Sequence, residues 1–410
     1  MKIVSEKSKL EIIQQSKVIL EKNRRIKDGF QYTVPSPTTY PYQWLWDSCF
    51  HAIVLSHIST SDAKKELLSL FSHQFENGML PHMIYWEKKE VINFRWGKEH
   101  TSSITQPPMV AYAAMQIYKK DKDIEFLRSI YPHLYHFYNY LLTERDPRRH
   151  HLASIINPDE SGEDNSPRFD APLGLPLKQT IKENLERRLE LVEKLKTCDF
   201  DAPFCMKHFF WAKDVPFNAI LAKNLKVLSE IAEILNFKED SIRYAEEHLH
   251  ITRAMRELMM EDGLFWPTYG ENYTKLKVKT WAIFSPLFAG MLTAEEARKL
   301  VDDYLLNPTE FKTAYPVPSV SKSDPSYDPT GFWRGPTWMA VNWFIWQGLK
   351  NYGMEKESDL ILQSSLDLIS KSGFREYFHP DTGLGMGAED FTWGTLIVDM
   401  MNNNDAQKNM

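Results

Sequence analysis

The stretch "WLWDSCFHAIVLSHI", from Trp44 to Ile58, begins with aromatic and acidic residues and continues as an almost unbroken apolar run. A helix that is apolar on every side is buried inside a protein, not laid on its surface. The same order recurs five more times, in segments that begin at Thr105, Asp214, Phe284, Gly335 and Phe391. Pro or Asp near the start of several segments suits a helix N-terminus. We therefore expect six buried helices, each preceded by a polar or aromatic segment.

Charged segments with a one-sided apolar face lie between these runs. They cover residues 8–23, 61–75, 123–144, 239–259, 293–306 and 355–373. Their spacing is helical, and strand signals are weak throughout the chain. The alternation predicts an all-α fold, an (α/α)6 barrel in which six outer helices surround six inner ones. In such a barrel the polar and aromatic segments converge at one rim.

The chain is expected to form a single domain over residues 1–410. This length suits twelve helices with long loops, and no linker divides it. No exact internal repeat is visible, which argues against a solenoid. The charged segment 171–207 is interpreted as an insertion within the domain.

Composition narrows the class of protein. Hydrophobic residues make up 43% and charged residues 25%, as in globular proteins. A net charge of −6 without a long basic run argues against nucleic-acid and membrane partners. The N-terminus lacks the apolar core of a signal peptide, and no apolar stretch is long enough to span a membrane. We expect a cytoplasmic protein, and the sequence is compatible with a homo-oligomer.

Cysteine and histidine spacing points to no metal or cofactor. Cys49, Cys198 and Cys205 are an odd number without metal-type spacing, which favours a reducing compartment. His150-His151 and His248-x-His250 form no metal motif, so surface positions are expected for them. "GLGMGA", residues 383–388, follows no hydrophobic strand and is interpreted as a turn, not a nucleotide-binding loop.

Aromatic residues are unusually frequent, at 13% with twelve Trp. They could simply fill a large core. However, they cluster with Gly, Pro, Asp and Gln in short segments such as "YPYQWLWD", "LPHMIYW", "GFWRGPTW" and "EDFTW". Flat rings beside carboxylates suit a sugar, because rings stack on its C–H faces while polar groups bind its hydroxyls. We therefore expect a carbohydrate site.

Two acidic regions supply candidate catalytic groups. "NPDESGEDNSPRFD", Asn157 to Asp170, holds five carboxylates, and a second acidic region lies between Glu376 and Asp390. The first could be only a solvated, turn-rich surface loop. Alternatively, one carboxyl from each region could hydrolyse a glycoside, one as acid and the other as base. A barrel would bring these distant regions together.

The acidic motifs carry a family resemblance. "ESGEDNSP" (residues 160–167) resembles the segment around the catalytic acid of the trehalase-like and family 63 glycoside hydrolases, whose pattern is ESG-x-D. "EYFHPDTG" (residues 376–383) resembles the segment that carries their catalytic base. The resemblance implies an inverting hydrolase in which Asp164 is the general acid and Glu376 is the base that activates water.

Three further motifs extend the resemblance from about residue 40 to 395. "YPYQWLWD" resembles the family's N-terminal sugar-site motif, "SSITQPP" a segment whose glutamine faces the ligand, and "GFWRGPTW" a pocket segment. With neighbouring residues of the aromatic and acidic segments, they give the expected substrate-binding set: Tyr40, Trp44, Trp46, Asp47, Tyr85, Gln106, Gly162, Lys213, Phe332, Trp333 and Trp338.

The short single-domain form most resembles the mannosylglycerate and glucosylglycerate hydrolases. An acidic aglycone such as glycerate needs cationic or amide partners. Gln106 is one candidate, and Lys213 and Arg334 are cationic candidates. Arg334 could equally pair with a carboxylate of the protein. The sequence leaves the choice between glucose and mannose open.

Four alternatives remain at this point. Glu389 competes with Glu376 as the base, although an acid before a helix also serves as a cap. The substrate could be a neutral α-disaccharide or oligosaccharide, as in a trehalase or a family 63 α-glucosidase. A sugar epimerase or isomerase would need paired histidines, and only His82 lies in an aromatic segment. A carbohydrate-binding protein without activity would need neither Asp164 nor Glu376.

Overall fold

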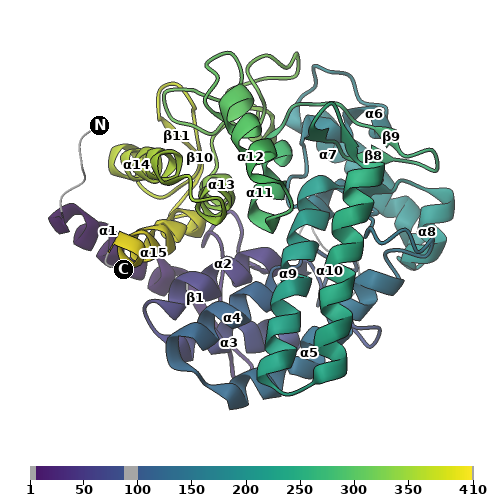
Figure 1. Cartoon of the computed structure of the whole chain (residues 1–410), viewed down its shortest axis with the longest axis horizontal. Coiled ribbons are helices and arrows are strands. Elements are labelled where there is room, and N and C mark those ends of the chain that lie inside the picture. Colours follow the sequence, from purple (N-terminus) through teal and green to yellow (C-terminus); the bar gives the residue numbers. More distant parts are fainter. Residues whose placement is uncertain (1–5, 87–99, 409–410) are drawn as a thin grey trace.

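The computed structural model describes residues 6–86 and 100–408, and it contains a helix in each of the twelve expected places (Figure 1). The apolar segments form α2 (Leu45–Ser56), α4 (Val110–Asp121), α9 (Val215–Ile234), α11 (Ser285–Ala289), α13 (Met339–Asn351) and α15 (Ile397–Lys408). The amphipathic segments form α1 (Glu6–Asn23), α3 (Thr60–Phe71), α5 (Ile124–Thr143), α10 (Lys238–Leu258), α12 (Ala294–Leu300) and α14 (Glu355–Ser372).

The apolar helices contact one another in a closed order. Helix α2 packs on α4, α4 on α9, α9 on α11, and α11 on α13. Helix α13 packs on the short helix η7 (Thr392–Leu396), which precedes α15 and returns to α2. Outside them lie α3 against α2, α10 alongside α9, and α14 against α13 (Figure 1). Neighbours on every side explain why α2 is buried from Leu45 to Ser56.

Short elements occupy the connections. The strands are β1 (Arg24–Lys27), β2 (Phe30–Thr33), β3 (Gln43–Trp44), β4 (Met83–Ile84), β5 (Ala212–Lys213), β6 (Met260–Glu261), β7 (Leu264–Phe265), β8 (Thr268–Tyr269), β9 (Thr274–Lys275), β10 (Arg375–Phe378) and β11 (Gly385–Glu389). The remaining one-turn elements are η2 (Pro158–Ser161), η3 (Pro167–Phe169), η4 (Trp281–Phe284), η5 (Val301–Leu305) and η6 (Phe332–Arg334). All strand pairs are antiparallel, in sheets of two or three strands.

The segment 171–207 is largely helical. It contains most of α6 (Asp170–Leu173), all of α7 (Ile181–Lys196) and the first part of α8 (Ala202–His208). A disulfide joins Cys198 and Cys205 there, while Cys49 is free and buried in α2. Spacing alone did not predict the disulfide, because it does not tell whether two sulfur atoms meet in space.

Two expectations concerned a signal peptide at the N-terminus and a membrane-spanning segment. The first five residues of the N-terminal segment lie outside the described residues. Among the helices within 6–86 and 100–408, none combines the length and the apolar character needed to cross a bilayer.

Candidate active site

Segments that precede α2, α4 and α13 meet around one cavity with parts of the acidic segment 157–170 and of the β10–β11 hairpin. The space between its walls measures about 540 Å³ when the open solvent at its mouth is included. The lining residues are Pro35, Tyr40, Trp44, Trp46, Asp47, His82, Gln106, Asp159, Gly162, Asp164, Phe332, Trp333, Trp338, Glu376, Phe391 and Trp393. Asp164 and Glu376 therefore face the same space, although half the chain separates them.

The five carboxylates of the segment 157–170 are not a solvated surface cluster. Each is paired with an arginine, and only two of the five line the cavity. The pairs are Glu160 with Arg145, Glu163 with Arg168, Asp170 with Arg334, and both Asp159 and Asp164 with Arg188. The interpretation as an exposed turn-rich loop is wrong for this segment, because arginines neutralise its charges.

Glu160 shows how the loop is held in shape. Its side chain is fully buried and receives two guanidinium bonds from Arg145, at 2.6 and 2.7 Å. It also accepts the backbone N–H groups of Thr105 and Ile156, at 3.0 and 2.7 Å. This carboxylate ties the acidic segment to the segment before α4. It does not line the cavity, so its role is structural.

Asp159 and Asp164 share one cation, Arg188 of α7. A guanidinium nitrogen of Arg188 lies 2.8 Å from Asp164 Oδ2, and another nitrogen contacts Asp159 Oδ1. The Arg188 side chain is nearly buried, whereas Asp164 is 28% exposed. Burial raises the pKa of Asp159 to about 6, an effect that Arg188 opposes and the neighbouring Asp164 reinforces. The charged segment 171–207 therefore places the guanidinium of Arg188 beside the acidic residues of the cavity.

Glu376 is held without a cation. The Tyr40 hydroxyl donates to Oε1 at 2.7 Å, and the backbone N–H of Ala388 donates to Oε2 at 2.8 Å. Burial raises the pKa of Glu376 above its usual value; these two hydrogen bonds oppose the rise, and Asp164 adds to it. The two carboxyl groups are thus close enough to influence one another electrostatically.

Gly387, in the middle of β11, allows the backbone to approach Glu376 closely. Gly387 has φ +67°, and a Cβ there would stand 2.4 Å from Glu376 Oε2. Glycine at this position lets the backbone reach the carboxylate. Glu389, at the end of the same strand, points elsewhere: it is 77% exposed and pairs with Arg375 at 2.7 Å. Its position gives no support to a role as the alternative base.

Aromatic rings form a large part of the lining. Trp333 and Trp338 stack in parallel, with centroids 3.9 Å apart. The indole N–H of Trp393 donates to Asp47 Oδ1 at 2.6 Å, and burial raises the pKa of Asp47 to about 6. Gln106 Oε1 accepts the backbone N–H of Trp46 at 3.3 Å, which fixes the first turn of α2 beside the cavity.

Gly162 allows the acidic segment to approach the aromatic wall. Its φ is +73°, and a Cβ would lie 2.3 Å from the indole of Trp46. Any other residue would therefore collide with that ring. The glycine of the ESG motif thus sets how closely the acidic loop packs on α2.

Two expected binding residues do not line the cavity. Tyr85 is buried and packs edge-on against Tyr42. His82, three positions before Tyr85, lines the cavity. Side chains three positions apart in an extended segment point to opposite faces, so the Tyr85 side chain points away from the cavity. Lys213 is buried against Asp146, 3.1 Å away, and the carbonyl of Leu152; burial lowers its pKa to about 8.

Arg334 also lies outside this lining. It makes two bonds to Asp170, at 3.0 and 2.7 Å, and is nearly buried. Of the two roles considered for it, the structure favours pairing with a protein carboxylate. None of the described residues that line the cavity is Lys or Arg.

Several lining residues were not expected. Asp159 and Trp393 lie in the acidic and aromatic segments already singled out, so proximity in sequence could have found them. Arg188 does not line the cavity but contacts Asp164, which does. It could not be found in this way, since it lies in an ordinary charged helix. The cavity's one described histidine, His82, has its pKa lowered to about 3 by burial, so it is neutral and unsuited to paired acid–base work.

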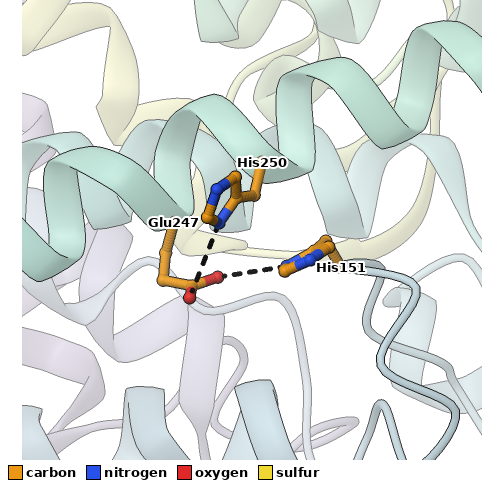
Figure 2. Close-up of side chains that lie close together, drawn as sticks. All are labelled: His151, Glu247 and His250. Carbon is orange, nitrogen blue, oxygen red and sulfur yellow. Dashed lines mark ion pairs between the residues drawn. The ribbon is translucent and has the colours of Figure 1, made fainter.

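Outside the cavity, the described residues include one group with metal-ligating side chains close together. These are His151, Glu247 and His250 (Figure 2). They bear on a separate inference below.

Known proteins resemble the whole chain. A family model described as the mannosylglycerate hydrolase MGH1-like glycoside hydrolase domain matches residues 40–394. The mannosylglycerate hydrolase of Thermus thermophilus is 33% identical and covers 93% of this chain and 98% of its own length. The glucosylglycerate hydrolase of Mycolicibacterium hassiacum is 28% identical, over 89% of this chain and 93% of its own.

A solved structure agrees with these relatives. The crystal structure of a GH63 mannosylglycerate hydrolase from Thermus thermophilus, in complex with Tris and D-glycerate, superposes with a TM-score of 0.88. It is 32% identical and covers 95% of this chain and 100% of that one. The helix-rich fold, the motif order and the sequence identity thus agree. The chain belongs to the mannosylglycerate hydrolase MGH1-like glycoside hydrolase family and is a glycoside hydrolase.

Proposed function

We propose that this enzyme hydrolyses an α-glucosyl or α-mannosyl conjugate of glycerate with inversion, using Asp164 as general acid and Glu376 as general base. Asp164 would protonate the glycosidic oxygen while Glu376 removes a proton from the attacking water. The observation that carries the proposal is the cavity itself, in which these carboxyl groups face one space beside stacked aromatic rings. The relatives' names supply the substrate class.

The closed order of apolar helices supports an (α/α)6 barrel forming one catalytic domain. In this interpretation α2, α4, α9, α11, α13 and α15 are the inner helices. The segments before α2, α4, α13 and α15 supply residues of the catalytic rim. The segment 171–207 is then an insertion that serves the site, because α7 carries Arg188 to Asp164. A cytoplasmic location stays part of this proposal, although the Cys198–Cys205 disulfide is of a kind that is rare in a reducing compartment.

Arg188 is the candidate partner for the acidic aglycone. Arg188 lies 2.8 Å from Asp164, the proposed acid, and can therefore reach a group that binds beside it. A carboxylate on the aglycone would offer Arg188 a third anionic partner, in addition to Asp159 and Asp164. Arg188 would then turn from Asp164 towards the substrate. This role replaces the one expected for Lys213.

Sugar binding at the other end would use the aromatic wall and its acids. Trp333 and Trp338 present flat apolar surface, while Asp47 and Gln106 offer acceptors for hydroxyl groups. Tyr40 has a double role, because it lines the cavity and donates to Glu376.

A substrate panel tests the proposal. It contains glucosylglycerate, mannosylglycerate, trehalose, kojibiose and nigerose, and we expect kcat/KM to be highest for one of the two glycerate conjugates. Better turnover of a neutral disaccharide would contradict the acidic aglycone while leaving the carboxyl pair intact. Proton NMR of the first product tests inversion, since an α-glycoside should release the β-sugar; initial release of the α-anomer would contradict it.

A neutral disaccharide remains the second candidate substrate. The observation in its favour is that no Lys or Arg belongs to the described lining. Arg188 separates the two candidates, because its replacement should weaken only the use of acidic substrates. The epimerase alternative finds no support in the single neutral His82.

A further inference from the structure

Three metal-ligating side chains meet on the outside of the molecule, away from the residues that line the catalytic cavity. His151 comes from the connection between α5 and η2, while Glu247 and His250 lie one turn apart on α10. Figure 2 shows both imidazoles directed toward the Glu247 carboxylate from the two elements. The individual motifs did not predict this group, because its members are distant in sequence.

The distances suit a shared metal ion. His151 Nδ1 lies 3.4 Å from Glu247 Oε2, and His250 Nδ1 lies 3.7 Å from Glu247 Oε1. Two ligands of a tetrahedral zinc ion, each about 2.1 Å from the metal, stand roughly 3.4 Å apart. One donor atom from each residue falls within 4.8 Å of the others. All three side chains are partly exposed, so small rotations can close the remaining gap.

The state of the His250 ring points to an unfilled bonding position. Its Nδ1 atom is shielded from solvent and has no hydrogen-bond partner. The two imidazole rings lie only 4.5 Å apart, and they share one carboxylate. A metal ion needs neutral imidazoles, and it would give this nitrogen a partner.

The backbone holds His151 in an unusual conformation. Its φ is +57°, in the left-handed region that few non-glycine residues adopt. The N–H of His151 donates to Asp146 Oδ2 at 2.7 Å, and the same carboxylate accepts from Lys213 at 3.1 Å. Strained residues of this kind cluster at functional sites. Here the strained turn is locked in the position that presents the imidazole to α10.

We propose that His151, Glu247 and His250 bind one divalent transition-metal ion, with zinc as the best fit. Two nitrogen ligands and one carboxylate suit zinc, whereas calcium and magnesium prefer oxygen. Water would complete the coordination. The ion would join α10 to the connection that follows Arg145, the residue that clamps Glu160. Its role is a structural clamp, so its main effect is on stability.

Zinc binding to the untagged protein, measured by isothermal titration calorimetry, tests this proposal. We expect one zinc ion per chain and a dissociation constant at least about tenfold weaker in His151→Asn and in His250→Ala. Asn tolerates the left-handed conformation, so His151→Asn preserves the turn while removing the ligand. The neighbours provide matched controls: His150 contacts Tyr273 and His248 bonds to the carbonyl of Ala222, so His150→Ala and His248→Ala should bind zinc normally.

Thermal unfolding gives a second readout. A ligand that binds only the folded state raises the Tm, so zinc should raise it in the wild type and in both controls but not in His151→Asn or His250→Ala. Calcium should not replace zinc in this effect. The proposal is overturned if wild type and His151→Asn bind zinc equally, or if the wild type shows no saturable binding.

Discussion

The two sides of the catalytic cavity hold their carboxyl groups by opposite means. On the acidic segment 157–170, every carboxylate faces an arginine, and Asp164 lies 2.8 Å from Arg188. On the β10–β11 hairpin, Glu376 has a tyrosine hydroxyl and a backbone N–H as its partners. The proposed acid therefore sits against a cation, and the proposed base sits in a site where burial raises its pKa.

This is the reverse of what the two roles would require in isolation. A general acid works best where its carboxyl group keeps its proton, and a general base works best where its carboxylate stays ionised. The difference indicates that a bound substrate would have to change the partners of both carboxyl groups before they react. On the acid side, a substrate carboxylate can take the place of Asp164 as the partner of Arg188. On the base side water and a sugar hydroxyl can supply the polar environment that Glu376 needs.

The largest effect should come from removing either carboxyl group. We expect Asp164→Asn and Glu376→Gln each to lower kcat by about 10²–10⁴-fold, the usual contribution of general acid–base catalysis. Steady-state kinetics on the preferred glycerate conjugate measure the loss. Circular dichroism controls for folding. Glu389→Gln is the matched control, since Glu389 is exposed; if it is inactive and Glu376→Gln is active, the base assignment is wrong.

The next effect separates structural from functional arginines on the acid side. Arg145→Met leaves the Glu160 carboxylate buried without its cation, which costs about 3–5 kcal/mol of folding free energy. Chemical denaturation should report this loss. Arg187→Met, an exposed position on α7, should change the unfolding free energy by less than about 1 kcal/mol. Equal losses in the two variants would contradict the structural role of Arg145.

The variant Arg188→Met tests the acid side of the cavity, where we propose that the acidic aglycone binds. A bond between a guanidinium and a carboxylate contributes about 1.5–3 kcal/mol, so kcat/KM for a glycerate conjugate should fall roughly 10–100-fold. Kinetics on a neutral glycoside of the same sugar provide the reference, and there the loss should be much smaller. A uniform loss on both substrates would show that Arg188 only supports the fold.

The smallest effect is expected on the base side, and it concerns pH. Glu376 acts as a base only when ionised, so activity falls as the pH drops through its pKa. Because burial raises that pKa, the loss begins at a higher pH than for an exposed glutamate. Tyr40→Phe removes a hydrogen bond that lowers the pKa, so the acidic limb of kcat/KM should move to still higher pH. At neutral pH the loss should be about tenfold at most.

If the acidic limb of kcat/KM in Tyr40→Phe stays in place or moves to lower pH, this account of Glu376 is contradicted. Tyr377→Phe is a control at the next residue in the strand, since the hydroxyl that bonds Glu376 belongs to Tyr40.

Helix positions and the cavity's acids and aromatics could be predicted because they depend on local patterns. Apolar runs such as the one from Trp44 identify buried helices, and short motifs mark Asp164 and Glu376. The arginine pairing could not be predicted, because Arg188 looks like any other charge on an amphipathic helix. Whether Lys213 faces a substrate or Asp146 is decided by which face of a two-residue strand it occupies. The Cys198–Cys205 bond and the His151 group likewise depend on contacts in space.

The parallel stack of Trp333 and Trp338 also gives the cavity a spectroscopic signal of its own. Two indole rings 3.9 Å apart exchange excitation energy and couple their electronic transitions, and Trp393 stands 5.4 Å from Trp338. A ligand that settles on this wall changes the polarity and the quenching of the whole group at once. We therefore expect near-ultraviolet circular dichroism and tryptophan emission to respond to occupancy, so that binding can be followed in the inactive Glu376→Gln variant without any label.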